Sequence, residues 1–153
     1  NFMTLLNRLP IFPLYFGGQT RFMPIFSGDL TDVIFNVLSK KIDNQIVECV
    51  GPETITLKEI VEKLLALIGK KRLLVPMPLF FGKLSAQFFQ LFPEPLLTQD
   101  QLRLLKYDNV ISGKYKTNSD IGVPARSLFE QEVKKYSYMW RDGGQFSKKN
   151  FKV

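Results

Sequence analysis

Residues 17–30 read GGQTRFMPIFSGDL, and this stretch decides how the first half of the chain is organised. Its two glycines separate two short apolar stretches, residues 12–16 and 21–26, a pattern that predicts a hairpin-like pair of strands. Pro13 and Pro24 would place parts of these strands at an edge or a bulge. The stretch then leads into a helix, which Ser27 or Asp29 is expected to cap.

Downstream of this stretch, apolar side chains recur at helical spacing from Leu30 to Leu38, which predicts a helix there. Residues 45–50 read as a strand, and Cys49 within it is expected to be buried, because an unpaired cysteine behaves as a small hydrophobe. A capping box formed by Thr56 and Glu59 opens the next helix, which ends at Gly69. Residues 72–75 are expected to form a short strand.

The second half of the chain is predicted to be mainly helical. Pro78 can open a phenylalanine-rich helix that runs to about residue 92, where Pro93-Glu94-Pro95 stops it. Two further capping boxes, at residues 98–101 and 127–130, are expected to open a helix through Leu105 and a last helix toward Trp140.

Short strands that alternate with helices predict an α/β fold, with too few strands for a complete doubly wound sheet. Residues 1–140 are expected to form one portion of such a fold, and residues 141–153 a basic, flexible tail. The net charge is +7, and residues 134–153 carry six Lys/Arg and one acid. Because the chain begins with Asn1 rather than Met, we expect it to be a portion of a longer protein.

Several kinds of chemistry are absent from the sequence. The chain has no histidine and a single cysteine, and it lacks the glycine-rich loops that cradle nucleotide phosphates. No carboxylate pair or metal-ligand cluster stands out, so no catalytic residue, cofactor-binding residue or metal ligand is assigned. The pattern also matches no nucleic-acid-binding module, and no nucleic-acid partner is expected.

The order of the segments resembles the C-terminal portion of the extended short-chain dehydrogenases/reductases. Residues 17–30 resemble the family's glycine-rich turn with an arginine before a strand and an aspartate-opened helix, and residues 119–130 resemble its C-terminal signature. Residues 21–25, and residues 95–102 with Lys106, Asp108, Asn109 and Val110, look like an atypical branch. That branch contains the accessory Rossmann-type subunit of respiratory NADH:ubiquinone oxidoreductase (complex I) and its bacterial relatives.

This resemblance implies a Rossmann-type parent that binds NADP or NAD through an N-terminal half lying upstream of Asn1. The family's Tyr-x-x-x-Lys would also lie upstream, since no tyrosine here has a lysine four positions later. Arg21 is the candidate substrate-binding residue, because the family arginine at this place reaches toward a substrate diphosphate. The alternative is that Arg21 is a surface strand residue or pairs with a nearby acid.

Three functions remain open from the sequence. The first is an accessory protein of NADH:ubiquinone oxidoreductase, bound to subunits of that complex or to another protein, in the cytoplasm or peripheral on the inner membrane (the matrix side in a eukaryote). Membrane contact would use the basic tail and the apolar side chains of the phenylalanine-rich helix: Phe80, Phe81, Leu84 and Phe88. The second is a fragment of a soluble nucleoside-diphosphate-sugar epimerase, dehydratase or reductase, and the third is a pure interaction module.

The sequence yields a direct prediction about the cofactor. Because the helix N-terminus and glycines that hold a pyrophosphate are absent, this chain alone should not bind NAD(H) or NADP(H) with micromolar or tighter affinity. Calorimetric titration of the purified chain with each dinucleotide measures this directly, and a micromolar dissociation constant would contradict it.

Overall fold

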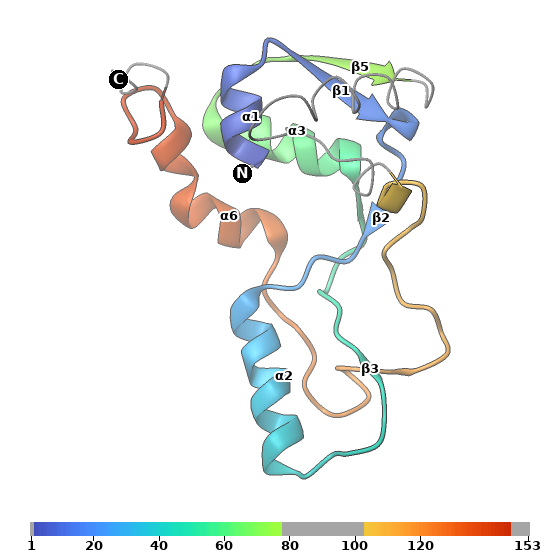
Figure 1. Cartoon of the computed structure of the whole chain (residues 1–153). Coiled ribbons are helices and arrows are strands. Elements are labelled where there is room, and N and C mark those ends of the chain that lie inside the picture. Colours follow the sequence, from blue (N-terminus) through green and yellow to red (C-terminus); the bar gives the residue numbers. More distant parts are fainter. Residues whose placement is uncertain (1, 78–102, 148–153) are drawn as a thin grey trace, which may run out of the picture.

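The computed structural model describes residues 2–77 and 103–147, which form a mixed α/β fold of short strands and helices (Figure 1). Its core is built around helix α3 (Leu57–Ile68). The predicted capping box is confirmed: the Thr56 hydroxyl accepts the Glu59 N–H, and the Glu59 carboxylate accepts the Thr56 N–H. Gly69 ends the helix in the left-handed conformation, with φ of 67°. Apolar side chains along one face of α3 are buried, with Val61 and Ile68 almost fully enclosed.

Helix α3 leads into strand β5 (Leu73–Met77), which pairs in parallel with the earlier strand β1 (Ile11–Tyr15). The pair lies beside α3 with helix α1 (Phe2–Arg8), which the sequence did not predict (Figure 1). Helix α6 (Phe129–Ser137) and the 3-10 turn η2 (Tyr138–Trp140) contact α3 as well. One hydrophobic core therefore joins the first third of the chain to its last described residues.

The predicted hairpin around Gly17-Gly18 is wrong. Residues 16–18 form a 3-10 turn, η1 (Phe16–Gly18), and the flanking strands pair with other partners. β1 pairs with β5, and β2 (Arg21–Phe22) pairs antiparallel with β4 (Ile55–Thr56). The reason is burial: in this arrangement Phe12 and Leu14 enter the core cluster around α3, which local pairing of two short strands does not provide.

A second group of elements lies at the other end of the molecule (Figure 1). It contains helix α2 (Ser27–Ser39) and the strands β3 (Val47–Glu48) and β6 (Lys116–Thr117), which pair in parallel. We call this group the α2–β3–β6 layer. The predicted helix is confirmed but its predicted cap is not, because Phe26 is the N-cap residue and no side chain caps it.

The predicted capping box at Ser127 is also wrong. Helix α6 begins at Phe129. Its N-cap residue is Leu128, whose side chain makes no capping hydrogen bond. The Ser127 N–H and hydroxyl donate instead to the Asp29 carboxylate, and the Glu53 carboxylate accepts the N–H of Phe129. Acids from distant segments thus take the place of the local cap that the sequence suggested.

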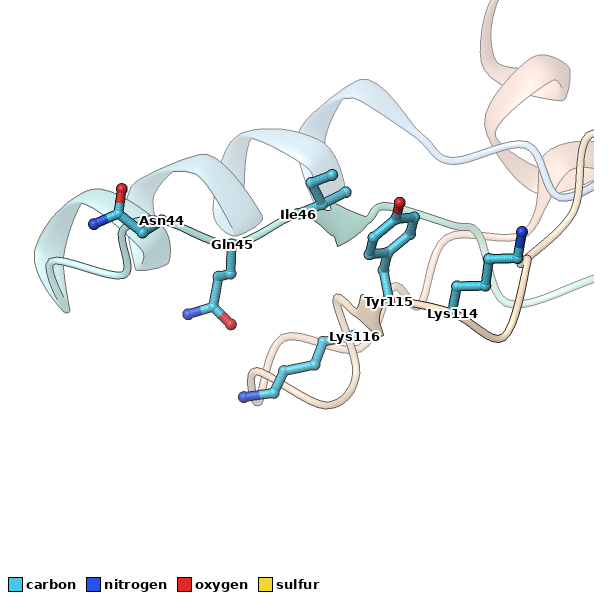
Figure 2. A pocket seen from close by; sticks show the side chains of 6 residues that line it. All are labelled: Asn44, Gln45, Ile46, Lys114, Tyr115 and Lys116. Atoms are coloured by element: carbon cyan, nitrogen blue, oxygen red, sulfur yellow. The ribbon is translucent and has the colours of Figure 1, made fainter.

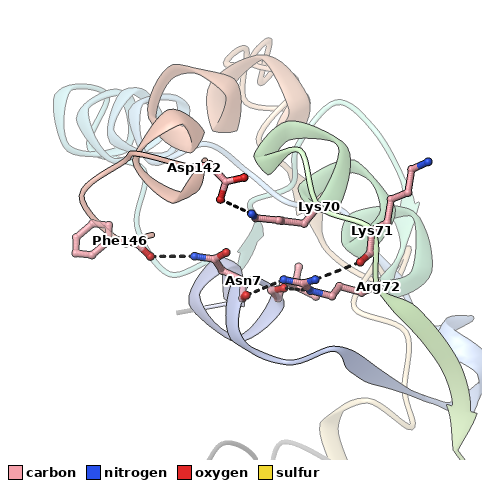
Figure 3. Close-up of polar contacts among 7 residues, drawn as sticks. Asn7, Lys70, Lys71, Arg72, Asp142 and Phe146 are labelled. Carbon is pink, nitrogen blue, oxygen red and sulfur yellow. Dashed lines mark hydrogen bonds and ion pairs between the residues drawn. The ribbon is translucent and has the colours of Figure 1, made fainter. Parts of the chain in front are cut away.

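Residues 141–147, the first part of the expected tail, are held by polar contacts (Figure 3). The Asn7 amide donates to the Phe146 carbonyl at 2.9 Å, and Lys70 pairs with Asp142. Arg72 donates to the carbonyls of Leu6 and Asn7 from the start of β5. These bonds tie α1, β5 and the segment after η2 together.

Several predicted elements lie outside the described residues. These are the phenylalanine-rich helix of residues 78–92 with its stop, the capping box at residues 98–101, and residues 148–153. Of the helix expected through Leu105, the described part contains Arg103 and Leu104, which are helical. In the parts of the chain that the structure describes, no helix is long and apolar enough to cross a membrane.

Gly51 lies closely against the backbone of Pro24. A Cβ atom on Gly51 would lie 1.8 Å from the Pro24 carbonyl oxygen, while one on Gly69 would meet nothing within 4 Å. We therefore predict that Gly51→Ala lowers the free energy of unfolding by about 3 kcal/mol or more, the upper end of overpacking costs. The control Gly69→Ala should cost about 1–2 kcal/mol, from its left-handed backbone alone. Urea denaturation of both variants tests the difference, and equal losses would contradict it.

Candidate functional site

Arg21, the candidate substrate-binding residue, lies in β2 and is engaged by Asp108. Its side-chain Nε and one terminal nitrogen donate to the same carboxylate oxygen of Asp108 at 2.9 and 2.8 Å. Its backbone N–H donates to the other carboxylate oxygen at 2.8 Å. The structure therefore has Arg21 paired with a nearby acid, the alternative that the sequence left open.

The pairing extends along the backbone on both sides of Arg21. The Asn109 N–H donates to the Arg21 carbonyl at 2.8 Å, and the Met23 N–H donates to the Asn109 carbonyl at 3.2 Å. The Thr20 hydroxyl donates to the Leu105 carbonyl. Residues 105–109 thus lie alongside β2, with one isolated parallel bridge between Phe22 and Asn109, and we call this set of contacts the Arg21–Asp108 clamp. Sequence reasoning did not identify Asp108 as a partner, because 87 residues separate it from Arg21.

The electrostatics of the clamp favour the ionised carboxylate. The backbone hydrogen bond from Arg21, and then the bonds from its side chain, hold the pKa of Asp108 below its ordinary value of 3.8. The Arg21 side chain remains 57% exposed and that of Asp108 36%, so water screens the pair. The Nε and one terminal nitrogen of Arg21 now donate to Asp108. A substrate phosphate would have to displace this carboxylate to accept hydrogen bonds from both nitrogens.

A hollow of about 520 Å³ lies beside the start of β3 and β6. Its lining combines two lysines and a tyrosine, Lys114, Lys116 and Tyr115, with the side chains of Asn44, Gln45 and Ile46. Figure 2 shows that the two lysine side chains point in different directions. All six lining residues are exposed. The hollow is therefore an open part of the surface, without side chains that converge on one point.

Other reactive groups are not assembled into a site either. Cys49 is half-buried directly after β3, and burial raises the pKa of its thiol, which disfavours the nucleophilic thiolate. Within residues 2–77 and 103–147, no group of three or more Cys, Asp or Glu side chains could hold a metal ion. Burial alone would raise the pKa of Asp29, but hydrogen bonds from Ser127 and Arg126 lower it. Asp29 thereby links α2 to the start of α6.

The outer face of α2 exposes three large apolar side chains. Val33 is buried, yet the large side chains on the other side of the helix are exposed: 52% for Ile34, 72% for Phe35 and 72% for Leu38. Ile34 and Leu38 belong to the apolar side chains whose helical spacing predicted this helix. The apolar face of a surface helix normally lies against the core, so exposure of these side chains is unusual.

Comparisons with known proteins do not identify the chain: it matches no family model and no curated protein.

The Arg21–Asp108 clamp predicts a pH-dependent stability. The pKa of Asp108 is lower in the folded state, so its contribution is present above about pH 3.8 and is lost as the pH falls through and below that value. The free energy of unfolding should therefore be lower for Asp108→Asn than for the unmodified protein at pH 7, and the difference should shrink toward pH 3. Urea denaturation across this range measures it.

Asp43→Asn is the matched control, since Asp43 is exposed and makes no ion pair or hydrogen bond in the described ranges. A difference for Asp108→Asn that stays constant down to pH 3 would contradict the role of the carboxylate charge.

Proposed function

We propose that this chain is the C-terminal, partner-facing portion of an NAD(P)-binding accessory protein associated with NADH:ubiquinone oxidoreductase, and that it performs no catalysis alone. The observation that carries the proposal is the incomplete α2–β3–β6 layer. Parallel sheets normally have both faces covered and several strands, whereas this layer has a two-stranded ladder of two residues per strand. Its helix also exposes Ile34, Phe35 and Leu38.

The Arg21–Asp108 clamp supports the family part of the proposal. The resemblance to the complex I branch rests mainly on residues 95–110, and residues 21–25 look like that branch as well. In the structure, the ends of these segments that are described lie side by side: Phe22 bridges to Asn109 and Arg21 pairs with Asp108. The two segments that resemble one branch of the family therefore contact each other. Chance similarity of two unrelated segments would not require such a contact.

The parent protein would bind NADP or NAD through a half that this chain does not contain. Its partners would be subunits of the respiratory complex, and its location the cytoplasmic or matrix side of the inner membrane. We assign the chain a docking role. The reactive groups of the described residues either take part in structural hydrogen bonds and ion pairs or lie apart from one another.

The second candidate is a portion of a nucleoside-diphosphate-sugar epimerase, dehydratase or reductase. That function would require the Arg21 guanidinium to face a diphosphate, and this guanidinium makes two of its bonds to Asp108. The clamp therefore favours the accessory protein over the sugar-nucleotide enzyme. A pure interaction module would use the same exposed α2 face, and the presence of a bound dinucleotide in the native assembly separates the two.

The test is isolation of the native assembly through a C-terminal affinity tag in mild detergent. We expect subunits of NADH:ubiquinone oxidoreductase to co-purify and one equivalent of NADP(H) or NAD(H) to be released on acid or alkaline extraction. An assembly that contains partner protein but no dinucleotide would support the interaction module. An assembly with a dinucleotide and turnover of a sugar nucleotide would support the enzyme.

The docking role predicts the effect of one matched pair of substitutions. Leu38 and Leu104 are each 72% exposed, so a charge at either position should leave the fold intact. We predict that Leu38→Asp reduces recovery of the partner at least tenfold, while Leu104→Asp leaves it within twofold. Circular dichroism of both variants checks the fold. Equal recovery with both variants would contradict a docking role for α2.

A further inference from the structure

We propose that Asp142 and Gly143 form a site of spontaneous modification, at which the aspartate rearranges to an isoaspartate through a cyclic imide. An aspartate or asparagine is most prone to this rearrangement when glycine follows it, because glycine has no Cβ atom to hinder the approach of its nitrogen. The pair at 142–143 is the one place in the sequence where Asp or Asn precedes Gly. This chemistry is independent of the docking role proposed above.

The two residues lie at the surface in the segment that follows η2. The Asp142 side chain is 81% exposed, and residues 141–147 form turns and bends rather than a helix or a strand. Gly143 has φ of 86°, a left-handed conformation that glycine takes readily. Its N–H donates no hydrogen bond within the described residues. The nitrogen that attacks the side chain is therefore not held by an acceptor of the protein.

The atoms of the rearrangement balance with water as the only co-reactant. The Gly143 nitrogen forms a bond to the side-chain carbonyl carbon of Asp142, and the proton of that nitrogen leaves with the carboxyl hydroxyl as one water. The product is a five-membered imide, to which a water then adds. Opening of the ring at the side-chain carbon restores aspartate. Opening at the main-chain carbon gives isoaspartate, in which the backbone runs through the side chain and is one methylene longer.

Lys70 restrains this reaction. Its ammonium pairs with the Asp142 carboxylate at 2.5 Å, from a side chain that is only 19% exposed (Figure 3). The ring closes from the protonated carboxyl, since a hydroxyl leaves as water more readily than an oxide does. A neighbouring cation favours the ionised carboxylate, which does not close the ring. The ion pair between Lys70 and Asp142 therefore slows the formation of isoaspartate.

An extra methylene at this place acts on the contacts that hold the C-terminal segment. The Phe146 N–H donates to the Met139 carbonyl at 2.8 Å, and the Asn7 amide donates to the Phe146 carbonyl at 2.9 Å (Figure 3). The Phe146 ring also lies 4.9 Å from that of Trp140, between ring centroids. Asn7 is buried, so loss of its acceptor leaves a buried donor unpaired. Isomerisation should therefore loosen the segment from α1.

Ageing of the whole purified chain at neutral pH and physiological temperature tests the site. Peptide mapping by mass spectrometry, with fragmentation that distinguishes isoaspartate from aspartate, measures the product at each position. Asp43 is an internal control in the same sample, since it is exposed and followed by Asn44 rather than glycine. We expect isoaspartate to accumulate at position 142 at least tenfold faster than at position 43. Equal rates, or isoaspartate at 142 that forms only after denaturation in urea, would overturn the proposal.

Substitutions test the roles of glycine and of the ion pair. Gly143→Ala should slow the reaction at least tenfold, and a Cβ atom there meets nothing within 4 Å. Lys70→Gln should accelerate it at least threefold, whereas Lys70→Arg keeps the cation and should retain the slow rate. A rate that is the same in all four proteins would overturn the proposal. If a variant does not fold, the comparison with Asp43 in the unmodified protein still decides the question.

The structural consequence is measured on the aged protein after chromatographic separation of the isomerised form. In that form, the Phe146 amide should exchange its hydrogen at least tenfold faster than in the unmodified form. The amide of Val61, in the middle of α3, should exchange at the same rate in both forms and is the control. An unchanged Phe146 amide would overturn the link between isomerisation and the C-terminal contacts.

Discussion

Burial of the apolar stripe of α3 is the constraint on which the rest of the structure depends. Val61 and Ile68 are almost fully enclosed, and α1, β1 and α6 gather around this helix. Burial at about 25 cal/mol per Å² is the dominant favourable term in folding, so elements that reach α3 are fixed by it. The α2–β3–β6 layer contributes no residue to the described core cluster around α3, and polar contacts at its boundary help to hold it.

Those polar contacts explain how a layer with little core of its own keeps a defined position. Asp29 accepts backbone and hydroxyl hydrogens from residues 126 and 127, and the buried side chain of Asn118 joins Val50 to Val123. Gly51 lies against Pro24 so closely that a side chain would collide. Each contact fixes backbone direction, yet together they bury little apolar surface. The layer is therefore well ordered internally while its outer apolar side chains stay uncovered.

Some features of the structure depend on residues that are neighbours in the sequence, and others depend on distant residues. The cap and stripe of α3 were predictable because every partner lies within four residues along the helix. The hairpin at Gly17 and the capping box at Ser127 failed because distant groups decide both places: β5 competes for β1, and Asp29 competes for Ser127. Arg21 could be selected as a candidate from the sequence. Nothing in the sequence links it to Asp108, because 87 residues separate the two.

This distinction between local and distant signals also bears on function. Two nitrogens of the Arg21 guanidinium already donate to one carboxylate oxygen of Asp108, so a substrate anion would compete with these charge-assisted bonds. The exposed side chains of α2 have no such competitor in the described residues. Apolar area that is still uncovered gains free energy when a partner covers it. In this chain that area lies on the α2–β3–β6 layer, which is why we propose a docking role for α2.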